Sequence, residues 1–414
     1  MKKNIILLGA LDTKGADYAF LKECIVARGC STLLVDVGVL GAPTIAPDIA
    51  AADVAAAAGQ DLAALRARGD RGAAVGAMAR GATMILTQLH AEGRLDGVIA
   101  LGGTGGTAVA CAAMRGLPLG VPKVMVTTVA GGDVSGYVGV SDITMMPSIT
   151  DVAGINRISR GVFARAAGAV CGMADTHVPA GSDRPLIAAS MFGNTTRAVE
   201  RAKATLEAEG FEMLVFHCTG TGGRMLEQLV TAGQIAGVLD ITTTEWADEL
   251  VGGVFTAGPD RLGAAARAGV PAIVTPACLD MVNFWAPATV PPQFAGRTFY
   301  QHNPNVTLLR TNVAECRQLG RILAEKLNAS TGPVTVLLPL RGLSMLDAPG
   351  GPFWLPDADA ALFAALKEHL RKDIPLIEMD CNVNDPEFAD RCAACLLAHL
   401  RAATSRDGKE NLQP

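Results

Sequence analysis

Short runs of apolar residues alternate along the chain with longer segments in which apolar residues recur every three or four positions. The runs predict buried strands and the longer segments predict amphipathic helices, an alternation typical of β-α-β units with parallel strands. In the first half the predicted strands are Ile5–Gly9, Thr32–Asp36, Gly97–Leu101 and Lys123–Thr127. The predicted helices are Ala16–Ala27, Asp61–Arg68, Gly72–Ala91 and Thr107–Met114, with a surface excursion over residues 42–59.

The second half of the chain repeats the element order of the first half. A strand at Pro185–Ser190, a helix at Thr196–Glu209 and a strand at Met213–Cys218 correspond to the opening strand, helix and strand. The turns agree most closely, because Leu89, Gly93, Gly97 and Val98 correspond to Leu229, Gly233, Gly237 and Val238. The pattern therefore predicts two similar lobes, each built on a parallel sheet.

These two lobes define the expected fold class and domain organisation. We expect an α/β protein with two Rossmann-like lobes, at residues 1–178 and 179–405, which are related by an internal repeat and face a common cleft. In such folds the loops after the carboxyl ends of the strands carry the ligand-binding residues. Residues 406–414 are expected to form a flexible tail.

Composition and charge narrow the classes of function. The net charge of −5, with only 4% aromatic residues, offers no basic surface for nucleic acid or an anionic membrane. No apolar stretch approaches the roughly 18 residues of a membrane span. The ten cysteines are scattered and several lie in apolar runs, which is typical of a reducing compartment. We therefore expect a cytoplasmic protein that binds neither membranes nor nucleic acid.

The strongest chemical motif is a glycine-rich turn. A buried strand ends at Leu101, four glycines follow within five residues, and an alanine-rich helix begins. Glycines let backbone N–H groups converge on an anion, and a helix N-terminus adds N–H groups of its own. A tight turn without a ligand is the alternative. The residues expected to bind phosphate here are Gly102, Gly103, Thr104, Gly105, Gly106 and Thr107.

Two further loops are natural companions of this turn. In the first strand-to-helix loop, Gly9 is expected to contact the nucleotide and Lys14 to neutralise a phosphate, while Asp12 and Thr13 serve phosphate or Mg²⁺. Capping of a helix by Asp12 or Thr13 is the alternative. Asp36 ends the second strand, where Rossmann-like folds place a carboxylate on ribose hydroxyls; a solvated strand end is the alternative.

A loop rich in glycines and hydroxyl groups follows the fourth predicted strand. From this loop we expect Thr128, Gly132 and Asp133 to contact the bound phosphate, and Asp133 to bind magnesium. A plain glycine-rich loop is the alternative. The class of nucleotide stays open on these residues, because Gly103-x-Gly105-x-x-Ala108 fits only a loose dinucleotide fingerprint and no Walker A spacing occurs.

The second lobe carries a similar anion nest and several polar strand ends. The nest follows a strand and opens a helix, an arrangement that suits a carboxylate or phosphate. Glu245, Asp280 and His302 are the acid/base candidates, although a buried and hydrogen-bonded histidine is the commoner role. The candidates for substrate binding are Asn194, Thr219, Thr221, Gly222, Gly223, Thr243, Asn283, Asn303 and Ser344.

Eight stretches, spread over nearly the whole chain, resemble a known family. They are Asp12–Lys14, Gly102–Thr107, Gly131–Ser135, Ser141–Ile143, Thr219–Gly223, Leu279–Phe284, His302–Pro304 and Pro349–Phe353. In them the sequence is similar to the uncharacterised proteins grouped with the ATP-binding N-terminal domain of the plant Tm protein, which confers resistance to tomato mosaic virus. Gly136 departs from the family pattern, which has Pro before the Tyr. The resemblance implies two Rossmann-like subdomains, ATP held by the first, and self-association as a homodimer or homotetramer.

The motifs and the resemblance lead to one functional prediction and two alternatives. We expect a protein that binds ATP and Mg²⁺, and an ATP-dependent enzyme that acts on a small carboxylated metabolite in the cleft between the lobes. The first alternative is a non-catalytic binding protein that responds to the nucleotide. The second is an NAD-dependent oxidoreductase that uses the Gly103–Ala108 fingerprint.

Overall fold

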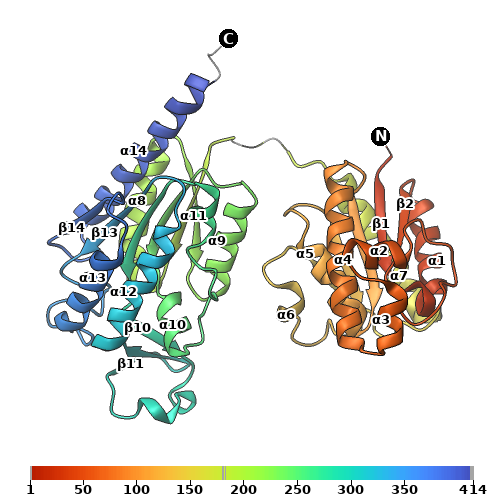
Figure 1. Ribbon diagram of the computed structural model, residues 1–414, viewed down its shortest axis with the longest axis horizontal. Coiled ribbons are helices and arrows are strands. Elements are labelled where there is room, and N and C mark those ends of the chain that lie inside the picture. Colours follow the sequence, from red (N-terminus) through yellow and green to blue (C-terminus); the bar gives the residue numbers. More distant parts are fainter. Residues whose placement is uncertain (1, 180, 182, 411–414) are drawn as a thin grey trace. The chain divides into compact units, whose positions relative to one another are not determined.

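The computed structural model describes residues 2–179, 181 and 183–410, with side chains described as far as residue 403. The chain divides into two compact units, Met1–Ala180 and Gly181–Pro414 (Figure 1). The sequence placed a domain boundary after residue 178. Among the described residues, no helix combines the length and the apolar character that crossing a bilayer requires.

The first unit is built on a parallel sheet whose central strands are buried on both faces. The strand order is β2-β1-β3-β4-β5, and every neighbouring pair is parallel. Because the order reverses between β1 and β3, the carboxyl ends of these two strands flank a topological switch point, where ligands bind in open α/β sheets. The strands are β1 (Asn4–Gly9), β2 (Ser31–Asp36), β3 (Gly97–Gly102), β4 (Lys123–Thr127) and β5 (Thr144–Pro147).

Helices cover both faces of this sheet. Alternate residues of β1 point to opposite faces, so that Leu7 packs with α1 and α7, whereas Leu8 packs with α2, α4 and α5. The helices are α1 (Leu11–Val26), α2 (Ala51–Ala57), α3 (Leu62–Arg68), α4 (Arg71–Ala91), α5 (Thr104–Arg115), α6 (Ser135–Val138) and α7 (Arg157–Asp175).

The second unit contains a larger parallel sheet and a small antiparallel one. The order of the parallel strands is β14-β13-β9-β8-β6-β7. The order in which the chain adds strands to the sheet therefore reverses again between β6 and β8, the first and third strands of the unit. The parallel strands are β6 (Leu186–Met191), β7 (Glu212–His217), β8 (Gly237–Thr242), β9 (Ala272–Ala277), β13 (Val334–Pro339) and β14 (Leu376–Met379). The antiparallel sheet, in the order β10-β12-β11, comprises β10 (Met281–Phe284), β11 (Phe299–Asn303) and β12 (Val306–Arg310).

Two helix layers also enclose the parallel sheet of the second unit. Residues of α8 and α14 form one apolar cluster with the sheet, and residues of α9, α12 and α13 belong to the cluster on the other face. Helix α14 continues to Glu410, within the predicted tail, and residues 411–414 lie outside the described part of the chain. The helices are α8 (Thr196–Ala208), α9 (Thr221–Thr231), α10 (Glu245–Val251), α11 (Ala264–Ala268), α12 (Val313–Asn328), α13 (Pro356–His369) and α14 (Pro386–Glu410).

The internal repeat predicted from the sequence is present in the backbone. Gly93 before β3 and Gly233 before β8 have φ of 67° and 70°, a left-handed conformation that favours glycine. After each of them, the next residue donates its N–H to the carbonyl of a leucine, Leu89 or Leu229. The expected α/β fold with two Rossmann-like, parallel-sheet lobes is therefore confirmed.

Two helix starts differ from the prediction in ways that affect the candidate site, and one helix was not predicted. Helix α1 begins at Leu11 instead of Ala16, and α5 begins at Thr104 instead of Thr107, so residues expected in loops lie in first helical turns. The excursion over 42–59 contains α2, whose Val54 is buried and packs so closely on α4 that only glycine fits at Gly81. An alanine-rich segment gave no clear apolar stripe, which explains the missed helix.

Candidate functional site

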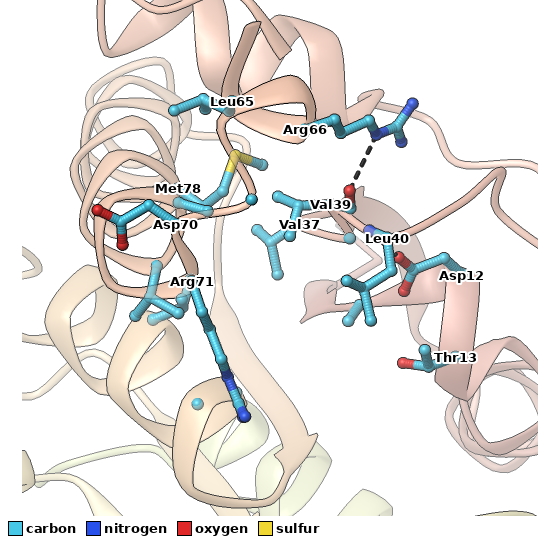
Figure 2. Close-up of a pocket in the computed structure, with 18 residues that line it drawn as sticks. Asp12, Thr13, Val37, Val39, Leu40, Leu65, Arg66, Asp70, Arg71 and Met78 are labelled. Atoms are coloured by element: carbon cyan, nitrogen blue, oxygen red, sulfur yellow. Dashed lines mark hydrogen bonds between the residues drawn. The ribbon is translucent and has the colours of Figure 1, made fainter. Parts of the chain in front are cut away.

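A cavity of about 490 Å³ opens at the carboxyl edge of the first sheet (Figure 2). Its walls come from the start of α1, the segment after β2, helices α3 and α4, and the first turn of α5. This volume lies within the range of about 300–1,000 Å³ that is usual for small-molecule sites. The cavity therefore adjoins the switch point between β1 and β3, where the topology favours a ligand.

The first turn of α5 forms one end of this cavity. Gly103 is the N-cap residue, no side chain caps the helix, and Gly105 and Gly106 line the cavity. The first-turn N–H groups of a helix have no intrahelical acceptor and carry the positive end of the helix dipole. This end of the cavity therefore suits an anion, as the glycine-rich turn predicts.

Arg71, the first residue of α4, supplies a cation at the same end. A Cβ atom placed on Gly105 would lie 3.5 Å from Nη2 of Arg71, so the guanidinium stands beside the α5 N-terminus. Within the described part of the chain, Arg71 has no hydrogen-bond or ion-pair partner. Figure 2 shows its side chain extended along the cavity. Arginine binds phosphate through several N–H donors at once, and the sequence reading did not single this residue out.

The segment Val37–Gly41, called the strap below, forms another wall of the cavity. Asp12 of α1 accepts hydrogen bonds from the N–H groups of Leu40 and Gly41, at 2.8 and 3.1 Å. From the other side, Arg66 of α3 donates to the carbonyls of Val39 and Gly41, at 3.0 and 2.8 Å. Two charged side chains thus hold the strap in place, and the Oδ2 atom of Asp12 accepts hydrogen bonds from the protein's backbone.

Asp36 has a structural role in place of the expected contact with ribose. Its Oδ1 atom accepts from the N–H groups of Leu11 and Gly38, at 3.0 and 2.8 Å, and the residue is 2% exposed. Burial raises the pKa of this carboxyl, and the two backbone hydrogen bonds oppose the shift. The carboxylate thereby accepts from the N–H group of the first residue of α1, Leu11, which is why that helix begins earlier than predicted.

Tyr18 explains why glycine stands at position 9. A Cβ on Gly9 would overlap the phenol ring of Tyr18. The Tyr18 hydroxyl donates to the carbonyl of Leu8 at 2.5 Å and accepts from the N–H of Leu101 at 2.8 Å. The ring therefore bridges β1 and β3 where the two strands diverge, and Gly9 admits this ring instead of contacting a phosphate.

Two other residues expected to bind phosphate are engaged elsewhere. Thr107 is fully buried, and its hydroxyl donates to the Gly103 carbonyl at 2.8 Å and pairs with the Thr127 hydroxyl at 2.6 Å. Lys14 lies at a kink in α1 with φ of −126° and donates to the carbonyl of Val152. Neither residue lines the cavity, because Thr107 is buried in the interior and the Lys14 side chain is directed to the carbonyl of Val152.

The loop after β4 stands beside the same edge of the sheet. The Oγ1 atom of Thr128 lies 3.7 Å from the position that a Cβ on Gly103 would take, so this exposed hydroxyl adjoins the α5 N-terminus. Asp133 is exposed, and its carboxylate accepts from the N–H of Ser135 at 2.9 Å; hydrogen bonding to the Ser135 side chain, followed by this backbone bond, lowers the pKa of Asp133. Gly132 is also exposed. One exposed carboxylate suits Mg²⁺ that is bound mainly by phosphates and water.

In the second unit, the predicted anion nest is already filled by a carboxylate of the protein. Oε1 of Glu245 accepts from the N–H groups of Gly220 and Gly223, at 2.8 and 3.0 Å. A Cβ on Gly223 would overlap the Glu245 carboxylate, so glycine is required there. The chemistry of the nest was predicted, but its anion is Glu245, which is 1% exposed and is inaccessible as an acid/base group.

Glu245 belongs to a buried ionic network around Arg261. Nε of Arg261 donates to Glu245 at 2.7 Å, while its two terminal nitrogens each donate to Asp240 at 2.6 Å. Glu227 completes the network, 3.3 Å from Arg261. Arg261 is 1% exposed, so these partners compensate a charge that water does not reach.

Asp280 and Ser344 come together although 64 residues separate them in the chain. Oγ of Ser344 donates to Oδ2 of Asp280 at 2.8 Å and accepts from the N–H groups of Leu346 and Asp347. Both residues are fully buried. Burial, followed by the negative charge of Asp347, raises the pKa of Asp280 to about 7. The pair follows the carboxyl ends of β9 and β13, but no described cavity reaches it.

The other candidates of the second unit do not assemble around Asp280. His302 and Asn303 are exposed on the hairpin of β11 and β12. Asn283 donates to Asp248 at 2.7 Å, and Thr243 donates to the Thr275 carbonyl at 3.0 Å. Thr219 and Thr221 flank the filled nest. Asn194 is buried, and its amide contacts the sulfur of Met281 at 3.4 Å.

One group of metal-ligating side chains occurs among the described residues. Cys381, Asp385 and Glu387 lie within 4.8 Å of one another near the start of α14. Asp385 accepts from the N–H of Asn382 at 2.7 Å, so it already stabilises the turn before the helix. Asp133, the predicted magnesium ligand, belongs to no such group in the described chain.

The fold and the cavity define an α/β protein of two parallel-sheet units, with a small-molecule cavity at the switch point of the first. The chain belongs to the uncharacterised protein family UPF0261, whose N-terminal domain matches residues 3–179 and whose C-terminal domain matches residues 184–400.

Relatives of the chain come from bacteria and from a plant. A UPF0261 protein of Clostridium tetani is 46% identical over 399 residues, which cover 96% of this chain and 99% of that protein. One from Rhizobium meliloti is 48% identical over 394 residues, covering 95% and 98%. The ToMV susceptible protein tm-1(GCR26) of Solanum lycopersicum is 37% identical over 409 residues, which cover 93% of this chain but 54% of the plant protein.

Proposed function

We propose that this protein binds ATP in the cavity of its first unit, with the phosphates at the N-terminus of α5. One observation carries the proposal. An uncapped helix N-terminus and the guanidinium of Arg71, which has no partner among the described residues, meet at one end of a cavity beside the switch point. Thr104 and Thr128 add exposed hydroxyls near that end. A polyphosphate is the anion that such a group of donors suits best.

Magnesium enters this proposal through the nucleotide. Mg²⁺ keeps most of its water and is bound through phosphates together with one or two carboxylates. Asp133 is the exposed carboxylate of the loop after β4, and it would serve as that protein ligand. When bound, the ion would neutralise phosphate charge that Arg71 alone does not balance.

The oxidoreductase alternative has less support than ATP binding. Its fingerprint requires a carboxylate on the ribose at the end of the second strand. Counted from the Gly103–Ala108 fingerprint, that strand is β4, which ends at Thr127 and offers no acidic residue. Titration with NAD(H) therefore serves as the comparison for ATP.

Calorimetric titration of the full chain with ATP and Mg²⁺ tests the proposal. Arg71→Ala is expected to weaken binding by roughly ten- to a hundredfold, because a charge-assisted contact contributes about 1.5–3 kcal/mol. Arg80→Ala is the matched control, since Arg80 is an exposed arginine of the same helix that does not line the cavity.

A second variant approaches the same site from the helix. Gly105→Val is expected to abolish binding, because its side chain would cover the first-turn N–H groups, while the nearest atom to the new Cβ lies at an ordinary 3.5 Å. Wild-type affinity in both Arg71→Ala and Gly105→Val would contradict the placement of the nucleotide. Binding of NAD(H) in preference to ATP would contradict its class.

An ATP-consuming reaction is a second candidate function. The observation in its favour is the contact between Asp280, with a pKa raised to about 7, and Ser344. The nest expected to receive a metabolite's carboxylate holds Glu245, so the chemistry of the second substrate is left to experiment. A steady release of ADP that Asp280→Asn abolishes, with ATP binding retained, would support this candidate, whereas binding without turnover would favour a nucleotide-responsive binding protein.

A further inference from the structure

Two side chains at the start of α1 line the cavity beside its phosphate end. Asp12 and Thr13 belong to the first turn of this helix and border the same cavity as Gly105 and Gly106 of α5. Because β1 and β3 are hydrogen-bonded neighbours, about 5 Å separates the strands that lead into the two helices. Figure 2 shows both side chains leaving α1 on the side of the cavity. The start of α1 therefore lies about one strand spacing from the proposed phosphate site.

The carboxylate of Asp12 is held in one orientation. Its Oδ2 atom accepts from the two strap N–H groups described above. A Cβ atom on Gly38 would lie 2.6, 2.7 and 2.8 Å from Cγ, Oδ1 and Oδ2 of Asp12, so the carboxylate packs directly against the strap. The Oδ1 atom is buried and has no hydrogen-bond partner among the described residues. A buried acceptor without a donor is costly, so a ligand that brings a donor group to Oδ1 is stabilised there.

Thr13 offers a hydroxyl beside this carboxylate. The residue is exposed and lines the cavity, and its hydroxyl forms no hydrogen bond within the described part of the chain. A hydroxyl both donates and accepts, whereas a carboxylate only accepts. The charge of Asp12 repels a phosphate, so this side of the cavity suits a neutral part of the ligand that carries hydroxyls. In a nucleotide, that part is the ribose.

Asp12 takes the place of Asp36 as the carboxylate available to a ribose. The sequence assigned the ribose to Asp36 at the end of β2, but this residue is buried and does not line the cavity. Asp12 packs against Gly38, two residues beyond that strand end, and does line it. The other acidic residue of the cavity wall, Asp70, caps α4 by accepting from the N–H of Ala73. A carboxylate therefore remains beside the strand end to which the sequence assigned the ribose.

We infer that Asp12 and Thr13 bind the two ribose hydroxyls of the nucleotide, with Oδ1 of Asp12 accepting from one of them. The inference rests on the proposed nucleotide binding and assigns this side of the cavity to the sugar, in place of the phosphate or Mg²⁺ expected from the sequence. The protein would thereby select ribonucleotides over deoxyribonucleotides. A hydrogen bond to a charged group contributes more than one between neutral groups, so the contact with Asp12 is the larger of the two.

Titration of the full chain with ATP, 2′-deoxy-ATP and 3′-deoxy-ATP tests the inference. One analogue is expected to bind roughly ten- to a hundredfold more weakly than ATP, because it lacks the hydroxyl that donates to Asp12. The other loses the neutral contact with Thr13 and should bind roughly two- to tenfold more weakly. Equal affinities for all three would overturn the inference and leave the proposed function standing. Failure of all three to bind would overturn both.

Asp12→Asn separates the contact with the ribose from the hold on the strap. Asparagine keeps one oxygen for the N–H groups of Leu40 and Gly41 but replaces the second carboxylate oxygen by an amide group. The variant is expected to bind ATP as weakly as the wild type binds the weaker analogue, and to bind that analogue within about threefold of the wild type. A loss of the same factor for ATP and this analogue would restrict Asp12 to the strap and contradict the inference.

Three further measurements complete the test. The ratios between ATP and its analogues should be the same in EDTA as with Mg²⁺, and an Asp12→Asn effect that requires Mg²⁺ would make Asp12 a metal ligand and contradict the inference. Thr13→Val should remove only the smaller of the two discriminations. Asp48→Asn is the matched control, since Asp48 accepts from the N–H of Leu34 in β2 and does not line the cavity, and it should leave all three affinities unchanged.

Discussion

Two buried carboxylates, Asp36 and Glu245, accept hydrogen bonds from backbone N–H groups beside loops that the sequence assigned to ligands. At Glu245 the local chemistry is what the sequence indicates, namely a glycine-rich turn with N–H groups that converge on an anion, whereas Asp36 was expected to bind a ribose. The identity of the anion depends on which side chain the fold brings there. Glu245 reaches Gly220 from 25 residues away, and no local pattern announces that contact.

The network around Arg261 leads to a prediction of stability. Arg261→Met would leave Asp240 and Glu245 buried without their cation, and should lower the free energy of unfolding by about 3–5 kcal/mol. Arg267→Met, an exposed position in α11, is the control and should change it by less than about 0.5 kcal/mol. Chemical denaturation of the two variants measures the difference. Equal stability would show that the network is not formed in solution.

At the scale of elements, strands β1–β4, β6 and β7 and helices α1, α3, α4, α5 and α8 follow from the apolar pattern, because a strand buried on both faces reads as a continuous apolar run. The same pattern placed the candidate loops at the carboxyl edge of the first sheet. It did not find α2, because an alanine-rich segment lacks contrast, and it did not find Arg71, because an exposed arginine at a helix start has no local signature. The sequence also did not predict the strap, because its backbone groups are hydrogen-bonded by Asp12 and Arg66, which are distant in sequence.

The strap gives a prediction at this scale. Asp12→Ala removes the acceptor of the Leu40 and Gly41 N–H groups and should speed hydrogen exchange of these two amides by tenfold or more. The rest of β1 and α1 should keep its protection, since Oδ1 of Asp12 has no partner among the described residues. Asp53→Ala, which removes the acceptor of the Ala50 N–H, is the control and should leave the strap unchanged. Unaltered exchange at Leu40 and Gly41 would mean that Asp12 does not hold the strap.

At the scale of the molecule, the second unit buries several carboxyl groups that resist ionisation. Burial raises the pKa of Asp248 to about 7, and burial together with the charge of Asp347 raises that of Asp359 to about 8. The pKa of an aspartate in the unfolded chain is about 3.9, so such a group binds more protons in the folded state, and folding is favoured at low pH.

A cleft shared by the two units, self-association and a cytoplasmic location remain predictions from the sequence.

The pH dependence of stability follows from these groups. The contribution of Asp248 is fully present below about pH 4 and is lost as the pH rises through about 7, with a slope approaching 1.4 kcal/mol per pH unit. Asp248→Asn should therefore flatten the decline in the free energy of unfolding between pH 4 and 7. Denaturation of both proteins at several pH values measures the two slopes. Identical slopes would indicate that Asp248 is ionised throughout this range in the folded protein.

The central claim, that a nucleotide binds at the start of α5, is tested most directly by amide NMR of the full chain with ATP and Mg²⁺. Gly105 and Gly106 are predicted to show large, saturable shifts, because their N–H groups begin an uncapped helix. Gly220 and Gly223 provide an internal reference, since both already donate to Glu245 and should not move. Saturable shifts at Gly220 and Gly223, with Gly105 and Gly106 unchanged, would contradict the account.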